Sequence, residues 1–72
     1  MDVYKVNGES REVGAIGIFE PFIENIAAES SREAYLTIRA NLYARNREHV
    51  LIKDISLITD DNYIKIEPRA YL

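Results

Sequence analysis

The first part of the chain alternates apolar and polar residues and then changes to a glycine-containing stretch. Residues 3–6 alternate, which predicts a β-strand, and Asn7-Gly8 directly after them is a turn signal. Residues 9–12 are polar and are expected to form a loop. Residues 13–18 place glycines among β-branched residues, a pattern typical either of a flexible lead-in to a strand or of a bulged strand.

Residues 19–27 form the next apolar run, and Pro21 interrupts it. Because proline has no N–H to donate to a sheet ladder, the pattern allows two interpretations. Either this strand lies at the edge of its sheet, or it begins near Phe22.

A capping box predicts the start of a helix. The Ser30 side chain is placed to accept a hydrogen bond from the Glu33 backbone, and the Glu33 side chain to reach back to the Ser30 N–H. The helix is expected to end near residue 43 or 44. Its apolar stripe repeats at four-residue spacing through Ala34, Ile38 and Leu42, with Tyr35 beside it.

Residues 50–58 are the strongest strand candidate, but their alternation changes phase near Lys53-Asp54. The change predicts a bulge there, or a strand that is buried on both faces. Residues 60–62 are expected to form a turn and residues 63–67 a last strand. Pro68 ends that strand, and residues 68–72 are expected to be frayed.

These elements predict a single α+β domain over residues 1–72, with its core within about residues 3–67. The expected architecture is a small, mostly antiparallel sheet with one helix packed on one face, in the order β-β-α-β-β. One helix covers only one face of such a sheet. The other face is therefore expected to be polar or covered by a partner.

Composition excludes several classes of site. The chain has 72 residues, 47% hydrophobic and 29% charged, which fits a folded domain with a small core. It has no cysteine and one histidine, so we expect no disulfide, no metal site and no cofactor. It has neither the roughly 20-residue apolar run of a membrane span nor a secretory signal. We therefore expect a cytoplasmic protein with no membrane partner.

Motifs for catalysis are also missing. The Gly14-Ala15-Ile16-Gly17 stretch lacks the helix start and the Gly-Lys-Ser/Thr ending of a phosphate loop. The carboxylates after residue 53 do not have calcium-loop spacing, and no nucleophile-elbow sequence surrounds a serine. We expect no catalytic residues, no enzymatic activity and no small-molecule substrate.

Positive charge is concentrated in one window of an acidic chain. The net charge is −3, yet residues 39–53 carry four basic side chains against Glu48 alone. Arginine binds phosphate with two parallel hydrogen bonds, amides reach base edges or 2′-hydroxyls, and Tyr43 offers a ring for stacking. The candidate RNA-binding residues are Arg39, Asn41, Arg45, Asn46, Arg47, His49 and Lys53. The alternative interpretation is a solvated helix end whose arginines favour the helix dipole.

Short motifs follow one another in a recognisable order over residues 3–58. Tyr4-Lys5-Val6-Asn7-Gly8 gives a strand with a Val-x-Gly ending. Pro21-Phe22 begins the second strand, and Ala28-Glu29-Ser30-Ser31-Arg32-Glu33-Ala34 begins the helix. Ala40-Asn41 and then Asn46-Arg47 come next, and Val50-Leu51-Ile52-Lys53-Asp54-Ile55 gives the final strand. This order resembles the archaeal large-subunit ribosomal protein LX family.

The resemblance implies a structural component of the 50S subunit that contacts 23S ribosomal RNA and adjacent ribosomal proteins, without catalysis. Asn41, Asn46 and Arg47 match contact positions of the family; the other candidates come from charge and proximity. The chain departs from the family in a connection poorer in basic residues and in residues 59–72, which the pattern does not cover. We therefore expect weak binding that depends on assembly.

A second hypothesis remains open beside the ribosomal one. The acidic N-terminal part and the half-covered sheet also suit an acidic protein-interaction or homo-oligomeric module without RNA binding. Weak self-association of the isolated protein is compatible with either hypothesis.

Overall fold

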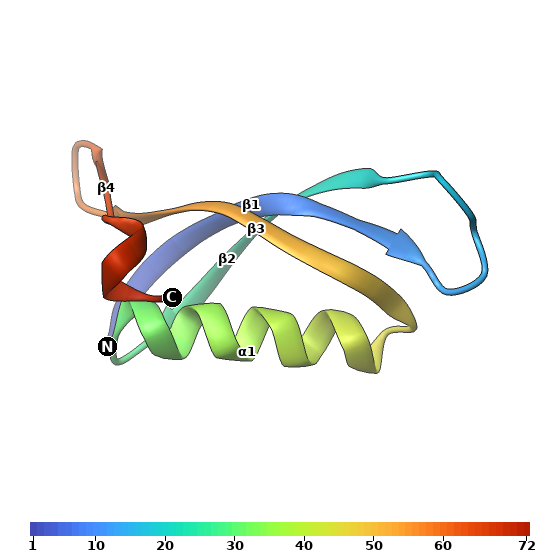
Figure 1. Cartoon of the computed structure of the whole chain (residues 1–72). Coiled ribbons are helices and arrows are strands. Elements are labelled where there is room, and N and C mark those ends of the chain that lie inside the picture. Colours follow the sequence, from blue (N-terminus) through green and yellow to red (C-terminus); the bar gives the residue numbers. More distant parts are fainter.

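A four-stranded antiparallel sheet with one long helix on one face forms the protein (Figure 1). The computed structural model describes residues 1–72. Its elements are β1 (Asp2–Glu12), β2 (Glu20–Ala28), α1 (Ser31–Ala44), β3 (Arg47–Ile58), β4 (Tyr63–Lys65) and a final 3-10 helix, η1 (Pro68–Ala70). The predicted α+β architecture is confirmed. The predicted order is matched in part, because η1 follows the last strand and the spatial order is β2-β1-β3-β4.

The prediction of a turn at Asn7-Gly8 is wrong, because β1 continues through it to Glu12. Gly8 pairs with Phe22 of β2 on one side and with Ile52 of β3 on the other. A Cβ atom at Gly8 would lie 2.0 Å from the Leu51 carbonyl oxygen. The glycine is therefore required for the close approach of two strands, a use that local turn statistics do not detect.

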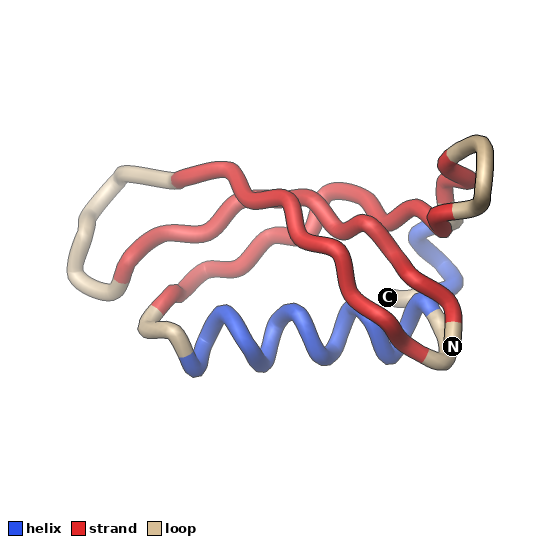
Figure 2. Tube along the Cα trace, turned by 180° about the vertical axis from the view of Figure 1, so that it is seen from behind, coloured by secondary structure: helices blue, strands red, loops and turns tan.

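Residues 13–19 form the loop of the β1–β2 hairpin rather than a strand (Figure 2). Gly14 and Gly17 adopt φ values of 91° and 77°, which a glycine reaches without steric cost. Pro21 lies in β2, which has β1 as its only neighbour in the sheet. The prediction of an edge strand at Pro21 is therefore confirmed.

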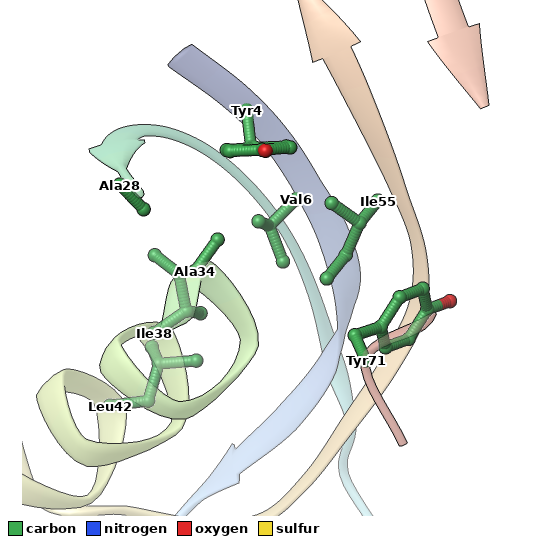
Figure 3. Close-up of a cluster of buried hydrophobic side chains, with 8 residues drawn as sticks. All are labelled: Tyr4, Val6, Ala28, Ala34, Ile38, Leu42, Ile55 and Tyr71. Carbon is green, nitrogen blue, oxygen red and sulfur yellow. The ribbon is translucent and has the colours of Figure 1, made fainter. Parts of the chain in front are cut away.

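The helix begins as its capping sequence predicts. Ser30 precedes α1 in an extended conformation, and its Oγ accepts a hydrogen bond of 3.1 Å from the Glu33 N–H. The return bond from the Ser30 N–H to the Glu33 side chain is not formed. The predicted stripe lies against the sheet, with Ala34, Ile38 and Leu42 all buried (Figure 3).

The predicted bulge in the third strand is confirmed. Asn7 pairs with Asp54, whereas the next residue, Gly8, pairs with Ile52, so Lys53 is the extra residue. A second irregularity lies between the pairs that Glu9 and Arg11 make with β3. At each of these two irregularities, the side chains of β3 change the face of the sheet to which they point.

The prediction of a frayed C-terminus is wrong. Tyr71 is 2% exposed, and its ring lies 5.6 Å from that of Tyr35, centroid to centroid. Arg32 donates to the Tyr71 carbonyl at 3.2 Å, and the Ser31 hydroxyl donates to the Ala70 carbonyl at 3.4 Å. Burial raises the pKa of the Tyr71 phenol, with a smaller contribution from the nearby Asp54 carboxylate. The tail therefore completes the core beside β3 and the start of α1 (Figure 3).

The sheet face opposite α1 carries no covering element (Figure 1). Successive side chains of β1 alternate between the two faces, so Tyr4, Val6 and Ser10 are buried toward α1 while Lys5 and Glu9 face outward. No helix of the structure has the length and apolar character needed to cross a membrane.

Candidate RNA-contact site

The turn between α1 and β3 is the centre of the predicted site. Asn46 has a φ of 67° and ends the helix, and His49 has a φ of 50° at the second irregularity of β3. Asn46 and His49 are the only non-glycine residues of the chain with a positive φ. Asparagine and histidine adopt this left-handed conformation more often than most residues. The side chains of Asn46 in the turn and of His49 in β3 are both exposed.

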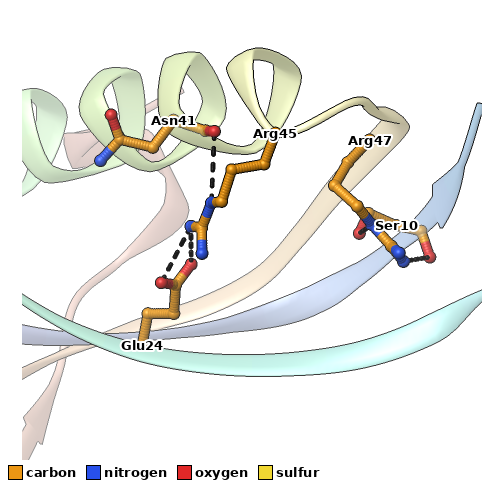
Figure 4. Close-up of polar contacts among 5 residues, drawn as sticks. All are labelled: Ser10, Glu24, Asn41, Arg45 and Arg47. Carbon is orange, nitrogen blue, oxygen red and sulfur yellow. Dashed lines mark hydrogen bonds and ion pairs between the residues drawn. The ribbon is translucent and has the colours of Figure 1, made fainter.

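Arg45 lies at the end of α1 and reaches across to β2 (Figure 4). Its Nη2 donates to both carboxylate oxygens of Glu24, at 3.0 and 2.9 Å, and its Nε donates to the Asn41 carbonyl at 3.4 Å. The side chain of Arg45 remains 55% exposed. Its charge is therefore compensated within the protein but open to solvent.

Arg47 has a structural role as well as a charge. Its Nε donates to the hydroxyl of Ser10 and its Nη2 to the Ser10 carbonyl, both at 3.1 Å (Figure 4). Its Nη1 donates to Glu20 at 3.0 Å. Because Ser10 is buried, water does not reach its hydroxyl and carbonyl oxygens, and Arg47 supplies their hydrogen-bond donors. Its own side chain is 21% exposed.

Both arginines line one open groove between the end of α1 and β2, with a volume of about 460 Å³. Its other polar walls are their partners Glu20, Glu24 and Ser10. Carboxylate and phosphate offer an arginine similar acceptor geometry. The groove is therefore a site where two guanidinium groups already hold anions.

The remaining candidates do not join this groove. Arg39 lies on α1 with its guanidinium 5.6 Å from the ring centroid of Tyr35 and 5.8 Å from that of Tyr43. Lys53 forms an ion pair with Glu9, whose side chain faces away from α1. The four cations of the basic window are thus distributed over three surfaces.

Carboxylates from distant parts of the sequence form ion pairs with most of the positive charges in residues 39–53. Of the four ion pairs in the structure, three join Arg45, Arg47 and Lys53 to Glu24, Glu20 and Glu9, and the fourth joins Arg11 to Glu48. The partners in the first three pairs are 21 to 44 residues apart in sequence. Sequence reasoning missed them because charge counted in windows treats the acidic part and the basic part separately.

Five cations take part in no ion pair, and sequence reasoning selected only one of them. They are Lys5, Arg32, Arg39, Lys65 and Arg69. Lys5 and Lys65 lie in one cross-strand row, on either side of Ser56 of β3. Lys5 lies 4.8 Å from the ring centroid of Tyr63. No local signal could have found this pair, because its members are far apart in the sequence.

Comparisons with protein-family models, with curated proteins and with solved structures found no match to this chain.

Proposed function

We propose that this chain is a non-catalytic structural component of the large ribosomal subunit that contacts 23S ribosomal RNA and adjacent ribosomal proteins. The proposal rests on the ordered resemblance to the LX family and on one structural observation. That observation is the turn at Asn46, where Arg45 and Arg47 flank a fixed left-handed residue and share one groove. Function at a ribosome in the cytoplasm is part of the same proposal.

The chemistry of Arg45 explains how an acidic protein binds RNA in this way. Its pair with Glu24 is exposed, and exposed ion pairs contribute about 0–1 kcal/mol. A phosphate can replace the Glu24 carboxylate at that small cost, and the release of counterions from RNA favours the exchange. Competition from Glu24 makes the contact weak in isolation. Neighbouring contacts in the assembled subunit would strengthen it.

Replacing Arg45 with alanine is expected to weaken co-sedimentation with large ribosomal subunits and to lower the salt dependence of binding. Each lost phosphate contact reduces the slope of log K against log salt by about one unit. We expect about one unit for Arg45→Ala and up to about two for Arg45→Ala with Arg47→Ala. The measurement is co-sedimentation at several salt concentrations.

Arg69→Ala is the matched control for that experiment. It removes one arginine that has no ion pair, from η1 at the other end of the molecule (Figure 1). Its slope should equal that of the unmodified protein. Equal slopes for Arg45→Ala and Arg69→Ala would contradict the proposed contact. Thermal unfolding of the double variant is needed as well, because Arg47 also holds buried Ser10.

The open edge of β3 favours a second candidate function, a protein-interaction or homo-oligomeric module. β4 pairs with β3 through residues 56–58, and the Ile66 N–H donates to the Ile55 carbonyl, so the outer edge of β3 has no strand partner before Ile55. The extra residue Lys53 interrupts that edge, which opposes regular strand addition. A stable dimer by light scattering, together with no binding to large subunits, would favour this function over the ribosomal one.

A further inference from the structure

The loop of the β1–β2 hairpin is the most apolar exposed segment of the protein. Residues 13–19 contain no charged side chain and no side-chain hydrogen-bonding group. Its exposed large apolar residues are Val13, Ile16, Ile18 and Phe19. Ile16 is 88% exposed, more than any other large apolar side chain of the chain, and none of the four belongs to the core. An apolar cluster outside the core is typical of a binding surface.

One backbone hydrogen bond joins the start of this loop to the proposed RNA contact. The Val13 N–H donates to the Asn46 carbonyl at 3.0 Å, and the Ala15 N–H donates to the Glu12 carbonyl at 3.0 Å. The Arg11 guanidinium lies 6.0 Å from the Phe19 ring centroid. Figures 1 and 2 both show the loop and the α1–β3 turn at the same end of the molecule. One partner assembly can therefore contact both.

The chemistry of the loop selects the kind of partner. RNA is a poor match, because the loop offers no cation or polar side chain and follows directly on the unpaired carboxylate of Glu12. A second copy is also disfavoured, since loop-to-loop pairing would bring two unpaired Glu12 carboxylates together in a chain of net charge −3. Glu12 is exposed and has no ion pair. An apolar pocket with a basic rim would match both features.

We propose that residues 13–19 insert into an apolar pocket with a basic rim on a neighbouring protein of the large subunit. This inference rests on the proposed function and adds to it a protein contact beside the RNA contact. The loop contributes apolar area, Glu12 meets the rim, and the α1–β3 turn meets phosphate. Gly14 and Gly17 let the loop adopt its positive φ values without steric cost.

Replacement of Ile16 and Ile18 by serine tests the docking. Burying an isoleucine stabilises a contact enough that loss of both should weaken binding to purified large subunits at least about tenfold. Serine adds no charge, so the salt slope should stay unchanged, in contrast to Arg45→Ala. The fold should be unaffected because neither residue is in the core. Unchanged affinity of the double variant would overturn the docking while the proposed function stands.

A photo-crosslinking residue at position 16 identifies the occupant on the same subunits. We expect a cross-link to a protein, and none from the matched position Leu36 on the exposed side of α1. Cross-links from position 16 to ribosomal RNA or to a second copy of this chain would overturn the inference. If the unmodified protein does not co-sediment at low salt, the proposed function fails, and the docking fails with it.

Discussion

Replacing Gly8 with alanine is expected to remove a large part of the free energy of unfolding. The new Cβ would lie 2.0 Å from the Leu51 oxygen and 2.9 Å from the Ile52 Cα, and both are backbone atoms of β3. Relief requires β1 and β3 to separate where the two central strands pair. A domain of this size has about 4–10 kcal/mol of stability, and we expect a loss of at least about 4 kcal/mol.

Circular dichroism during urea titration measures this loss. Gly14→Ala is the matched control, because a Cβ there meets nothing within 4 Å and only the φ of 91° is strained. It should cost about 1–2 kcal/mol. A Gly8→Ala variant as stable as Gly14→Ala would show that the close approach of the strands is not required.

Replacing Tyr71 with alanine is expected to cost about 3–5 kcal/mol, the range for large buried aromatic residues. The Tyr71 side chain is almost completely buried and packs against Tyr35 near the start of α1. In a chain of 72 residues the core has few members, so each one supplies a large share of the stability.

Urea unfolding again provides the measurement, with Leu72→Ala as the control. Leu72 is 69% exposed, so its replacement should change the free energy of unfolding by less than about 0.5 kcal/mol. A similar small effect at Tyr71 would contradict the packing of the tail and support the frayed terminus expected from the sequence.

The sequence correctly predicted the features that depend on residues close to one another along the chain. Ser30 begins the helix, Ala34, Ile38 and Leu42 face the sheet, and the phase change at Lys53 is a bulge. Each depends on residues within a few positions of one another. The 3.6-residue and 2-residue periods of helix and strand make such signals readable from the sequence.

The predictions were wrong where contacts between distant segments determine the local structure. Asn7-Gly8 has turn chemistry, but the approach of β3 places it within a strand. Tyr71 follows a proline near the chain end, yet it is buried in the core and packs against Tyr35. A pattern along one segment contains no information on a distant segment that packs against it.

At the candidate site, too, the local positions were predictable and the long-range contacts were not. The positions of Arg45, Asn46 and Arg47 between helix and strand followed from the sequence, and they do lie at that turn. Their compensation by Glu24 and Glu20 did not, since the register of β1 with β2 brings those carboxylates to the groove. Net charge over a window therefore overstated the free positive charge of the site.

Binding of the Glu24→Gln variant to large ribosomal subunits at low salt tests whether RNA phosphate replaces the Glu24 carboxylate at Arg45. The variant keeps the shape of the side chain but removes the anion that competes with RNA phosphate for Arg45. We expect the variant to bind more tightly than the unmodified protein by about twofold to fivefold, and Arg45→Ala to bind more weakly. Unchanged or weaker binding of Glu24→Gln would contradict the exchange of carboxylate for phosphate at Arg45.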